Sequence, residues 1–156
     1  PSRRGVSYWP GDDATPARII VTSSTRLLAL DAATGASIES FGQGGETDMG
    51  VPYNSVPLVY GDIVVVGANT PRGAPGGIGN ARAFDARTGE TLWEQRTNSG
   101  IIGVPSTYMI DGVQYVAVQS GWGVDAASMR RRIDDDRGTE TFVPSGGVIW
   151  VFALER

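Results

Sequence analysis

The 156-residue sequence contains no histidine, no cysteine and no lysine, so every basic residue in it is an arginine. Without histidine or cysteine the chain has no Ser-His-Asp or Cys-His nucleophile system and no zinc site built on those ligands. Without lysine it has neither a Schiff-base residue nor a P-loop. Any chemistry would therefore use carboxylates, arginines, hydroxyls, amides or a bound cofactor.

Charge and hydrophobicity narrow the class of protein further. The formal net charge of −4 argues against a general nucleic-acid binder. No apolar run approaches the length of a membrane-spanning helix, and no signal peptide is visible. A chain of this length, 40% hydrophobic, is expected to form one domain with a real core. Its 22 glycines and 9 prolines fit many short strands joined by frequent turns.

Two segments of the chain repeat the same pattern of strand, loop, strand, tight turn and strand. One begins at Arg18 and the other at Asp62, and both contain the motif A-x-D-A-x-T-G, at residues 29–35 and 83–89. The Asp and Thr side chains can satisfy backbone donors of the turn, and the Gly can adopt the positive φ that a tight hairpin requires. The motif therefore predicts the same turn twice.

A third unit has the strands "GVQYVAVQSGWG" and "GGVIWVFAL" but lacks this turn, and it ends on alternating Trp150, Phe152 and Leu154. The only helix candidate is 125–133, "DAASMRRRI", where Asp125 could cap an insertion between strands. Alternation without a long helical period predicts an all-β fold.

Each unit is too small to bury its own sheet, so the units must stack. The sequence predicts a single partial β-propeller domain over residues 1–156, with about three four-stranded antiparallel sheets. The early blades would extend to about residue 97 and the C-terminal blade from about 98 to 156. Because a closed propeller usually has at least about four blades, either blades are missing or several copies assemble into a homo-oligomer.

The turn "AFDARTGETLW" resembles the repeat of the quinoprotein dehydrogenases, propellers that bind pyrroloquinoline quinone (PQQ). The opening "RRGVSYWPGDDATPARIIV" is similar to the early segment of the methanol, ethanol and glucose dehydrogenases. The closing "SGIIGVPSTYMIDGVQYVAVQSGWG" and "GGVIWVFAL" resemble the last blade of the alcohol dehydrogenases. The resemblance implies that the middle blades are absent, with a join near 97–99. It also implies that the last blade could still pack beside the first, as in a closed ring.

The resemblance implies that Arg4 helps to hold the quinone, because a planar guanidinium suits a tricarboxylate. The alternative is a surface arginine that pairs with a turn carboxylate such as Asp12. In the loop 64–77, Asn69 and Thr70 could contact the cofactor, although a plain Gly/Pro-rich connection is an equal alternative. Arg72 stands near the position where relatives carry a metal-binding Glu, so no metal ligand is expected here.

The resemblance adds three weaker candidates. Ser55 matches a hydroxyl position that faces the cofactor, and Gly121 and Trp122 belong to a loop that lies over the quinone. Packing on a neighbouring blade is the alternative for Trp122. In contrast, Trp93 and Trp150 are expected to pack between blades without any chemistry.

No residue matches the catalytic base or the ligands of the family's Ca²⁺ or lanthanide ion, and the run 134–136, "DDD", is expected to be a solvated charge run. The resemblance implies a PQQ-dependent alcohol or sugar dehydrogenase-like protein, incomplete as a lone chain. It further implies a small alcohol or sugar as substrate, cytochrome c or a quinone as electron acceptor, and a periplasmic location. A non-catalytic propeller scaffold or self-assembling module is the alternative.

Overall fold

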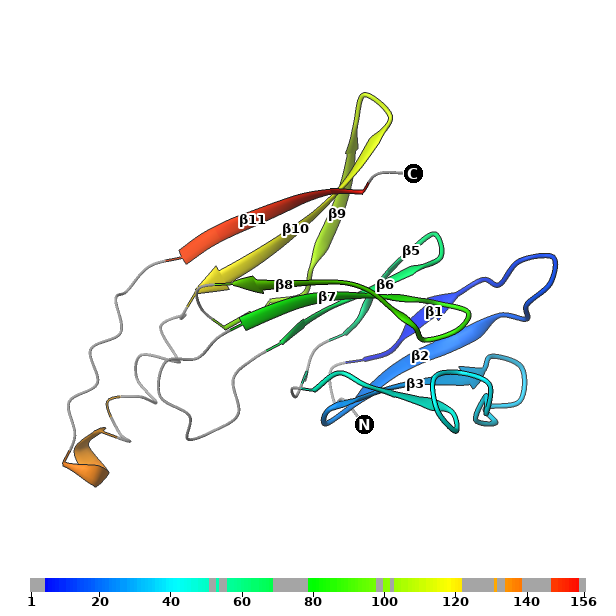
Figure 1. Cartoon of the computed structure of the whole chain (residues 1–156), viewed down its shortest axis with the longest axis horizontal. Helices are drawn as coiled ribbons and strands as arrows, with labels where there is room; N and C mark the ends of the chain where they lie inside the picture. The colour runs from blue at the N-terminus through cyan, green and yellow to red at the C-terminus, as the bar shows by residue number, and fades with distance from the viewer. Residues whose placement is uncertain are drawn as a thin grey trace.

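The computed structural model describes residues 5–50, 53, 56–68, 79–97, 100–101, 103–121, 131, 134–138 and 147–154. Within these residues the chain forms three antiparallel β-sheets, stacked face to face (Figure 1). The all-β, partial-propeller prediction is therefore confirmed. The third sheet differs from it, since three described strands form this sheet where four were expected.

In every sheet the strands lie side by side in the order of the sequence. The first sheet contains β1 (Ser7–Trp9), β2 (Arg18–Ser23), β3 (Arg26–Asp31) and β4 (Glu46–Asp48). The second contains β5 (Leu58–Tyr60), β6 (Ile63–Ala68), β7 (Gly79–Asp85) and β8 (Thr91–Thr97). The third contains β9 (Ser106–Ile110), β10 (Val113–Gly121) and β11 (Gly147–Leu154).

The repeated motif forms the same turn after β3 and after β7, as predicted. In the first copy, Asp31 Oδ1 accepts hydrogen bonds from the backbone N–H of Thr34 at 2.8 Å and from its hydroxyl at 2.8 Å. In the second copy, Asp85 Oδ1 accepts the equivalent bonds from Thr88 at 2.8 and 3.2 Å. The glycine that ends each motif has a φ of +74°, a conformation that residues with a Cβ rarely adopt.

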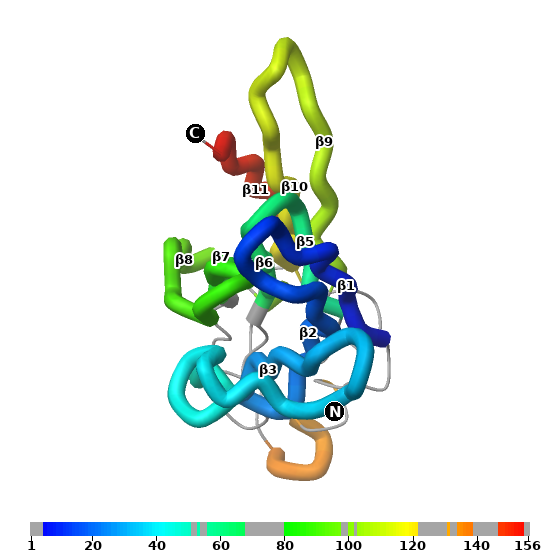
Figure 2. Tube along the Cα trace, turned by 90° about the vertical axis from the view of Figure 1, so that its right-hand side faces the viewer, coloured from blue at the N-terminus to red at the C-terminus, as the bar shows by residue number. Residues whose placement is uncertain are grey.

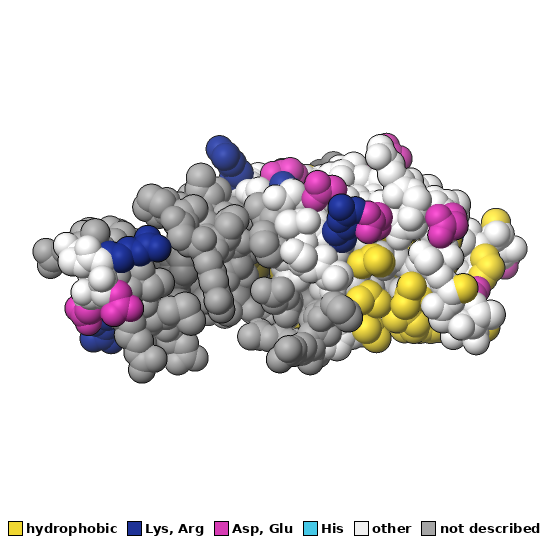
Figure 3. All heavy atoms as spheres, turned by 90° about the horizontal axis from the view of Figure 1, so that it is seen from below, with side chains coloured by type: hydrophobic (Ala, Val, Ile, Leu, Met, Phe, Trp, Pro, Cys, Tyr) yellow, Lys and Arg dark blue, Asp and Glu magenta, His cyan; other side chains and the backbone are white. Residues whose placement is uncertain are grey.

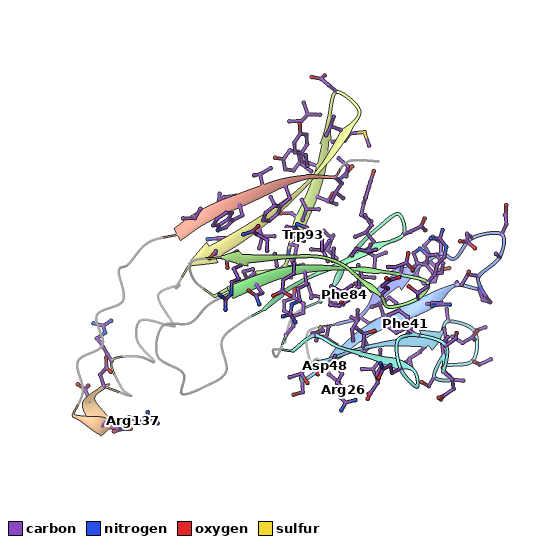
Figure 4. All side chains as sticks on the ribbon, viewed as in Figure 1. Arg26, Phe41, Asp48, Phe84, Trp93 and Arg137 are labelled. Carbon is purple, nitrogen blue, oxygen red and sulfur yellow. The ribbon has the colours of Figure 1, made fainter. Side chains whose placement is uncertain are left out.

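Two hydrophobic cores hold the stack together, one on each face of the second sheet. The first core joins sheets one and two, and Figure 4 shows Phe41 and Phe84 between these sheets. The second core joins sheets two and three. There the Trp93 indole of β8 packs edge-on against Phe152 of β11, with ring centroids 4.5 Å apart. The prediction that Trp93 packs between blades is confirmed.

The second sheet therefore lies in the middle of the stack, with the third sheet on its far side (Figure 2). The expectation that the last blade packs beside the first, as in a closed ring, is wrong for this chain. The physical reason is that β6 and β7 present Val65, Ala81 and Ala83 on the face turned away from the first sheet. Val116 and Val118 of β10 cover these side chains.

The helix expected at 125–133 falls mostly outside the described residues. The helical residues that are described are Arg131 and 134–137, so the described part of the helix reaches beyond the expected end. No helix in the described part of the chain is long and apolar enough to cross a membrane.

Candidate functional site

Antiparallel pairing brings the starts of β1, β5 and β9 to the same edge of the stack as the ends of β2, β6 and β10. We call this edge the loop edge and define it by five described residues, which follow one another across the three sheets. These residues are Gly5, Val56, Gly67, Ile101 and Gly121.

Direct contacts connect the sheets along the loop edge. Strands β1 and β5 are neighbours, and the Ser7 hydroxyl of β1 donates to the Pro57 carbonyl just before β5. On the third sheet, Ile101 pairs with Ser120 near the end of β10. The Gly121 N–H donates to the Gly100 carbonyl at 3.0 Å. The edge is thus a continuous rim from the first sheet to the third.

Gly67 is the closest approach between the second and third sheets at this rim. A Cβ added to Gly67 would lie 3.0 Å from Ile101 Cβ and even closer to Ile101 Cγ2. Gly67 is buried, and Ile101 is only 1% exposed. Only glycine therefore fits here without moving the Ile101 backbone.

The sequence analysis singled out six cofactor-binding candidates, and the structure describes one of them. Gly121 ends β10 and lies at the loop edge. The other five lie outside the described residues: Arg4, Ser55, Asn69, Thr70 and Trp122. Their neighbours in the sequence are described, however, and Gly5, Val56, Ala68 and Gly121 belong to strand ends at this one edge.

The opposite edge of the stack carries a group of charged and aromatic residues that we call the Arg87 cluster. It consists of Trp9, Asp12, Arg18, Asp62 and Arg87. The Arg87 guanidinium pairs with Asp12 through Nε and with Asp62 through Nη2, the latter at 2.7 Å. The Trp9 indole donates to Asp62 Oδ1 at 3.3 Å, and the Arg87 guanidinium lies 5.5 Å from the Trp9 ring centroid. Sheets one and two are thereby tied together.

Arg18 is the most buried charge of the Arg87 cluster, with a relative exposure of 5%. Its Nη1 donates to the Ala86 carbonyl at 3.2 Å and to the Arg87 carbonyl. Its guanidinium lies 5.6 Å from the Trp9 ring centroid. Burial lowers the pKa of Arg18 from its usual value, but an arginine stays charged at any ordinary pH. Arg18 thus acts as a fixed cation that fastens the second repeat turn to the first sheet.

The acidic partners of this cluster are neutralised by arginine. The hydrogen bond from Arg87 holds the pKa of Asp12 below its usual value, and the Asp12 bond in turn raises the pKa of Arg87. The alternative pairing of Asp12 with Arg4 is therefore replaced in the structure by a pair with Arg87. A carboxylate held in this way is a poor general base, because its pKa is shifted away from neutrality.

Nothing in the described part of the chain resembles a metal site, since no three acidic side chains gather there. Asp135 and Asp136 are exposed, as a solvated charge run would be. The absence of metal ligands expected from Arg72 concerns a residue outside the described ranges.

Sequence reasoning missed the Arg87 cluster. Two signals were available: an arginine directly before the apolar strand "IIVTS", and an arginine inside the second copy of the repeat turn where the first copy has Ala33. Neither signal names the partners, because Asp12 and Asp62 lie 75 and 25 positions away from Arg87 and meet it only in the folded stack.

Three stacked four- and three-stranded antiparallel sheets with a common loop edge define a part of a β-propeller. The family model "PQQ: Glucose/ethanol/alcohol dehydrogenase, beta-propeller domain" matches residues 1–94 and 78–116. The chain belongs to this family of PQQ-dependent dehydrogenase propellers.

Individual relatives agree with the family model. The chain is 37% identical over 108 residues to 1-butanol dehydrogenase (quinone) of Thauera butanivorans, covering 65% of this chain and 15% of that protein. It is 36% identical over 107 residues to the quinoprotein alcohol dehydrogenase PedH of Pseudomonas putida, covering 66% and 16%. A solved quinohemoprotein alcohol dehydrogenase, ADHIIG from Pseudomonas putida HK5, is 29% identical with a TM-score of 0.45, covering 75% and 15%. The chain thus spans about a sixth of the length of these relatives.

Proposed function

We propose that this chain supplies part of the cofactor side of a PQQ-dependent alcohol or sugar dehydrogenase, with the quinone held at the loop edge. One observation carries the proposal. Gly5, Val56, Ala68 and Gly121, which adjoin the predicted cofactor residues in the sequence, belong to strand ends at the same edge of the stack. Residues spread over more than 110 positions are thereby directed to one place.

The donor set suits the chemistry of PQQ. Arg4 carries a fixed charge and a planar fork for a carboxylate, while Ser55, Thr70 and Asn69 offer hydroxyl and amide donors for carboxylate and carbonyl oxygens. Trp122 adds an aromatic surface for a flat ring. When bound, PQQ would accept a hydride equivalent from the alcohol, and the protein would supply its orientation.

The chain contributes no assigned catalytic base and no assigned ligand for the Ca²⁺ or lanthanide ion of the family. Among the described carboxylates, Asp12 and Asp62 are paired with Arg87. The 156 residues are therefore proposed to bind PQQ without oxidising methanol, ethanol or glucose. In the complete enzyme the electrons would pass to cytochrome c or a quinone in the periplasm, as the family resemblance implies.

A calorimetric titration with PQQ, in buffers with and without Ca²⁺, tests the proposal. We expect saturable binding to the wild-type chain and at least tenfold weaker binding to Arg4→Gln. Arg3→Gln is the matched control, because it removes the same charge one residue earlier and should leave the affinity unchanged. No saturable heat with the wild type, or equal loss in both variants, would contradict the proposal.

The alternative, a non-catalytic propeller module, is favoured by one observation: the described clustered carboxylates serve contacts between sheets. Titration and a dye-reduction assay separate the two. Binding without turnover supports a cofactor-holding segment, whereas neither binding nor turnover supports a scaffold.

A further inference from the structure

The first and third sheets each leave one face uncovered, and both faces are apolar. On the first sheet this face carries Tyr8, which is 57% exposed, together with Ile19, Leu28 and Leu30 of β2 and β3. Register and strand alternation place these side chains opposite to Ile20, Leu27 and Ala29, which enter the first core. Figure 3 shows hydrophobic side chains gathered on this lower side of the molecule.

The uncovered face of the third sheet is formed by alternate residues of all three strands. Its exposed members include Tyr108, Ile110, Ile149 and Val151, and Ile149 is 70% exposed. Tyr108 stacks on Tyr115 of β10, with ring centroids 5.4 Å apart. None of the residues of β9, β10 and β11 is charged. Such a contiguous apolar sheet face is typical of a surface that packs against another element.

The two uncovered faces are of the two kinds that meet inside the stack. At each internal interface, one sheet meets its neighbour with the face that carries the alanine of the repeat, Ala29 or Ala83. The second sheet presents Phe84 from its opposite face to the first sheet, and Phe84 is fully buried there. The repeat aligns Leu30 with Phe84. The first sheet thus lacks a preceding sheet, and the third lacks a following one.

We propose that a second copy of this chain covers both faces, so that the third sheet of each copy packs on the first sheet of the other. A partner of a different kind would have to match two separate faces, whereas a second copy supplies one of each kind. Such a head-to-tail contact closes a ring when the rotation fits. Two copies give six sheets, within the usual range of about four to eight blades; three copies would exceed it.

The ring has a consequence for the loop edge. Because a head-to-tail ring is related by rotation about its central axis, the loop edges of both copies would lie at the same end of the ring. The proposal itself depends only on the two apolar faces, so it stands or falls separately from PQQ binding.

Light scattering coupled to size exclusion, with native mass spectrometry, tests the proposal on the unaltered chain. The expected mass is twice the 16.5 kDa of one chain. A monomer at all concentrations would overturn the proposal. A mass that grows beyond two copies as concentration rises would also overturn it, because the contact would then not close.

Two substitutions test the head-to-tail arrangement. Tyr8→Arg places a charge on the first sheet's face and Val151→Arg on the third sheet's face, at side chains that are 57% and 48% exposed. Each substitution alone should weaken dimerisation at least tenfold. Leu92→Arg is the matched control, since Leu92 is 52% exposed on β8 of the middle sheet.

A dimer that resists Tyr8→Arg but is lost in Val151→Arg would show a contact between two third sheets and overturn the ring. Circular dichroism and the thermal unfolding midpoint check that each variant is folded. Ile149→Arg is a second probe of the third sheet, should Val151→Arg fail that check.

Discussion

At the scale of single residues, Arg87 and Gly67 show how the two edges of the stack are specialised. Arg87 joins two carboxylates and an indole of the first two sheets at one edge. Gly67 allows the second and third sheets to approach each other at the loop edge. One residue type acts through charge and the other through the lack of a side chain, and both serve contacts between sheets.

The ion pair between Asp12 and Arg87 predicts a loss of stability in acid. The pKa of Asp12 is lower in the folded chain than its usual value of 3.8, chiefly because of the hydrogen bond from Arg87. The contribution is therefore present at pH values above about 4 and is lost as the pH falls through the folded pKa. We expect the wild type to lose more thermal stability between pH 5 and pH 2.5 than Asp12→Asn.

Thermal unfolding followed by circular dichroism across this pH range measures the difference. Asp13→Asn is the control, because Asp13 is the exposed neighbour of Asp12 in the same turn and removes the same formal charge. Parallel pH profiles for the wild type and Asp12→Asn would contradict the prediction.

Gly67→Ala should destabilise the chain through overpacking. The added methyl group would collide with Ile101, which is buried, and overpacking in a filled core costs about 1–3 kcal/mol. Urea unfolding measures the change in the free energy of unfolding. Gly103→Ala is the control, because a Cβ there has no neighbour within 4 Å, and equal effects of the two substitutions would contradict the explanation.

At the scale of elements, the two repeat turns are alike inside but differ in what they touch. The turn after β7 accepts hydrogen bonds from the first sheet. Gly42 N–H donates to the Thr88 carbonyl at 2.7 Å, and the Thr47 hydroxyl donates to the Gly89 carbonyl at 2.8 Å. The turn after β3 has the same internal bonds.

Removing the aspartate from each turn separates local from inter-sheet stabilisation. Asp31→Ala should lower the free energy of unfolding by about 1 kcal/mol, the usual net worth of such a hydrogen bond. Asp85→Ala should lower it by about 2 kcal/mol, since bonds to the first sheet also depend on that turn. Urea unfolding of the two variants gives the comparison. Equal losses would show that the contacts made by the second turn contribute nothing.

Trp93 is the element contact that most strongly joins the second sheet to the third. It is only half-buried, so Trp93→Ala should cost about 2–3 kcal/mol, less than a fully buried tryptophan. Trp93→Phe should retain most of the stability, because an aromatic ring can still pack edge-on against Phe152. Urea unfolding measures both variants. Similar losses in both would contradict the role given to the aromatic contact.

The elements themselves were predictable because their signals are local. Period-2 alternation gave β10 and β11, and the motif with Asp31 and Asp85 gave the two turns. The Arg87 cluster was not predictable, because its partners are distant in the sequence and nothing local marks which carboxylate an arginine will meet. The candidate site was predicted as a set of residues by family resemblance. Its described part, the loop edge, follows from strand pairing.

At the scale of the whole molecule, the order of the sheets is the main departure from expectation. Resemblance to a closed ring placed the last blade beside the first, but the structure packs it on the second. The chain lacks the intervening blades of its relatives, so the free face of the second sheet, with Val65, Ala81 and Ala83, is available to the next sheet in the sequence. Apolar faces of one kind are interchangeable to the extent that their shapes fit. Which face a blade selects is therefore not written in its local pattern.

The central claim of this account is that PQQ binds at the loop edge. Hydrogen–deuterium exchange of the chain with and without PQQ tests it most directly. The account predicts that PQQ slows exchange in peptides that contain residues 4–7, 67–70 and 119–122, and leaves peptides of the opposite edge, such as 85–90, unchanged. Protection of 85–90, or none in the peptides of the loop edge at saturating PQQ, would contradict it.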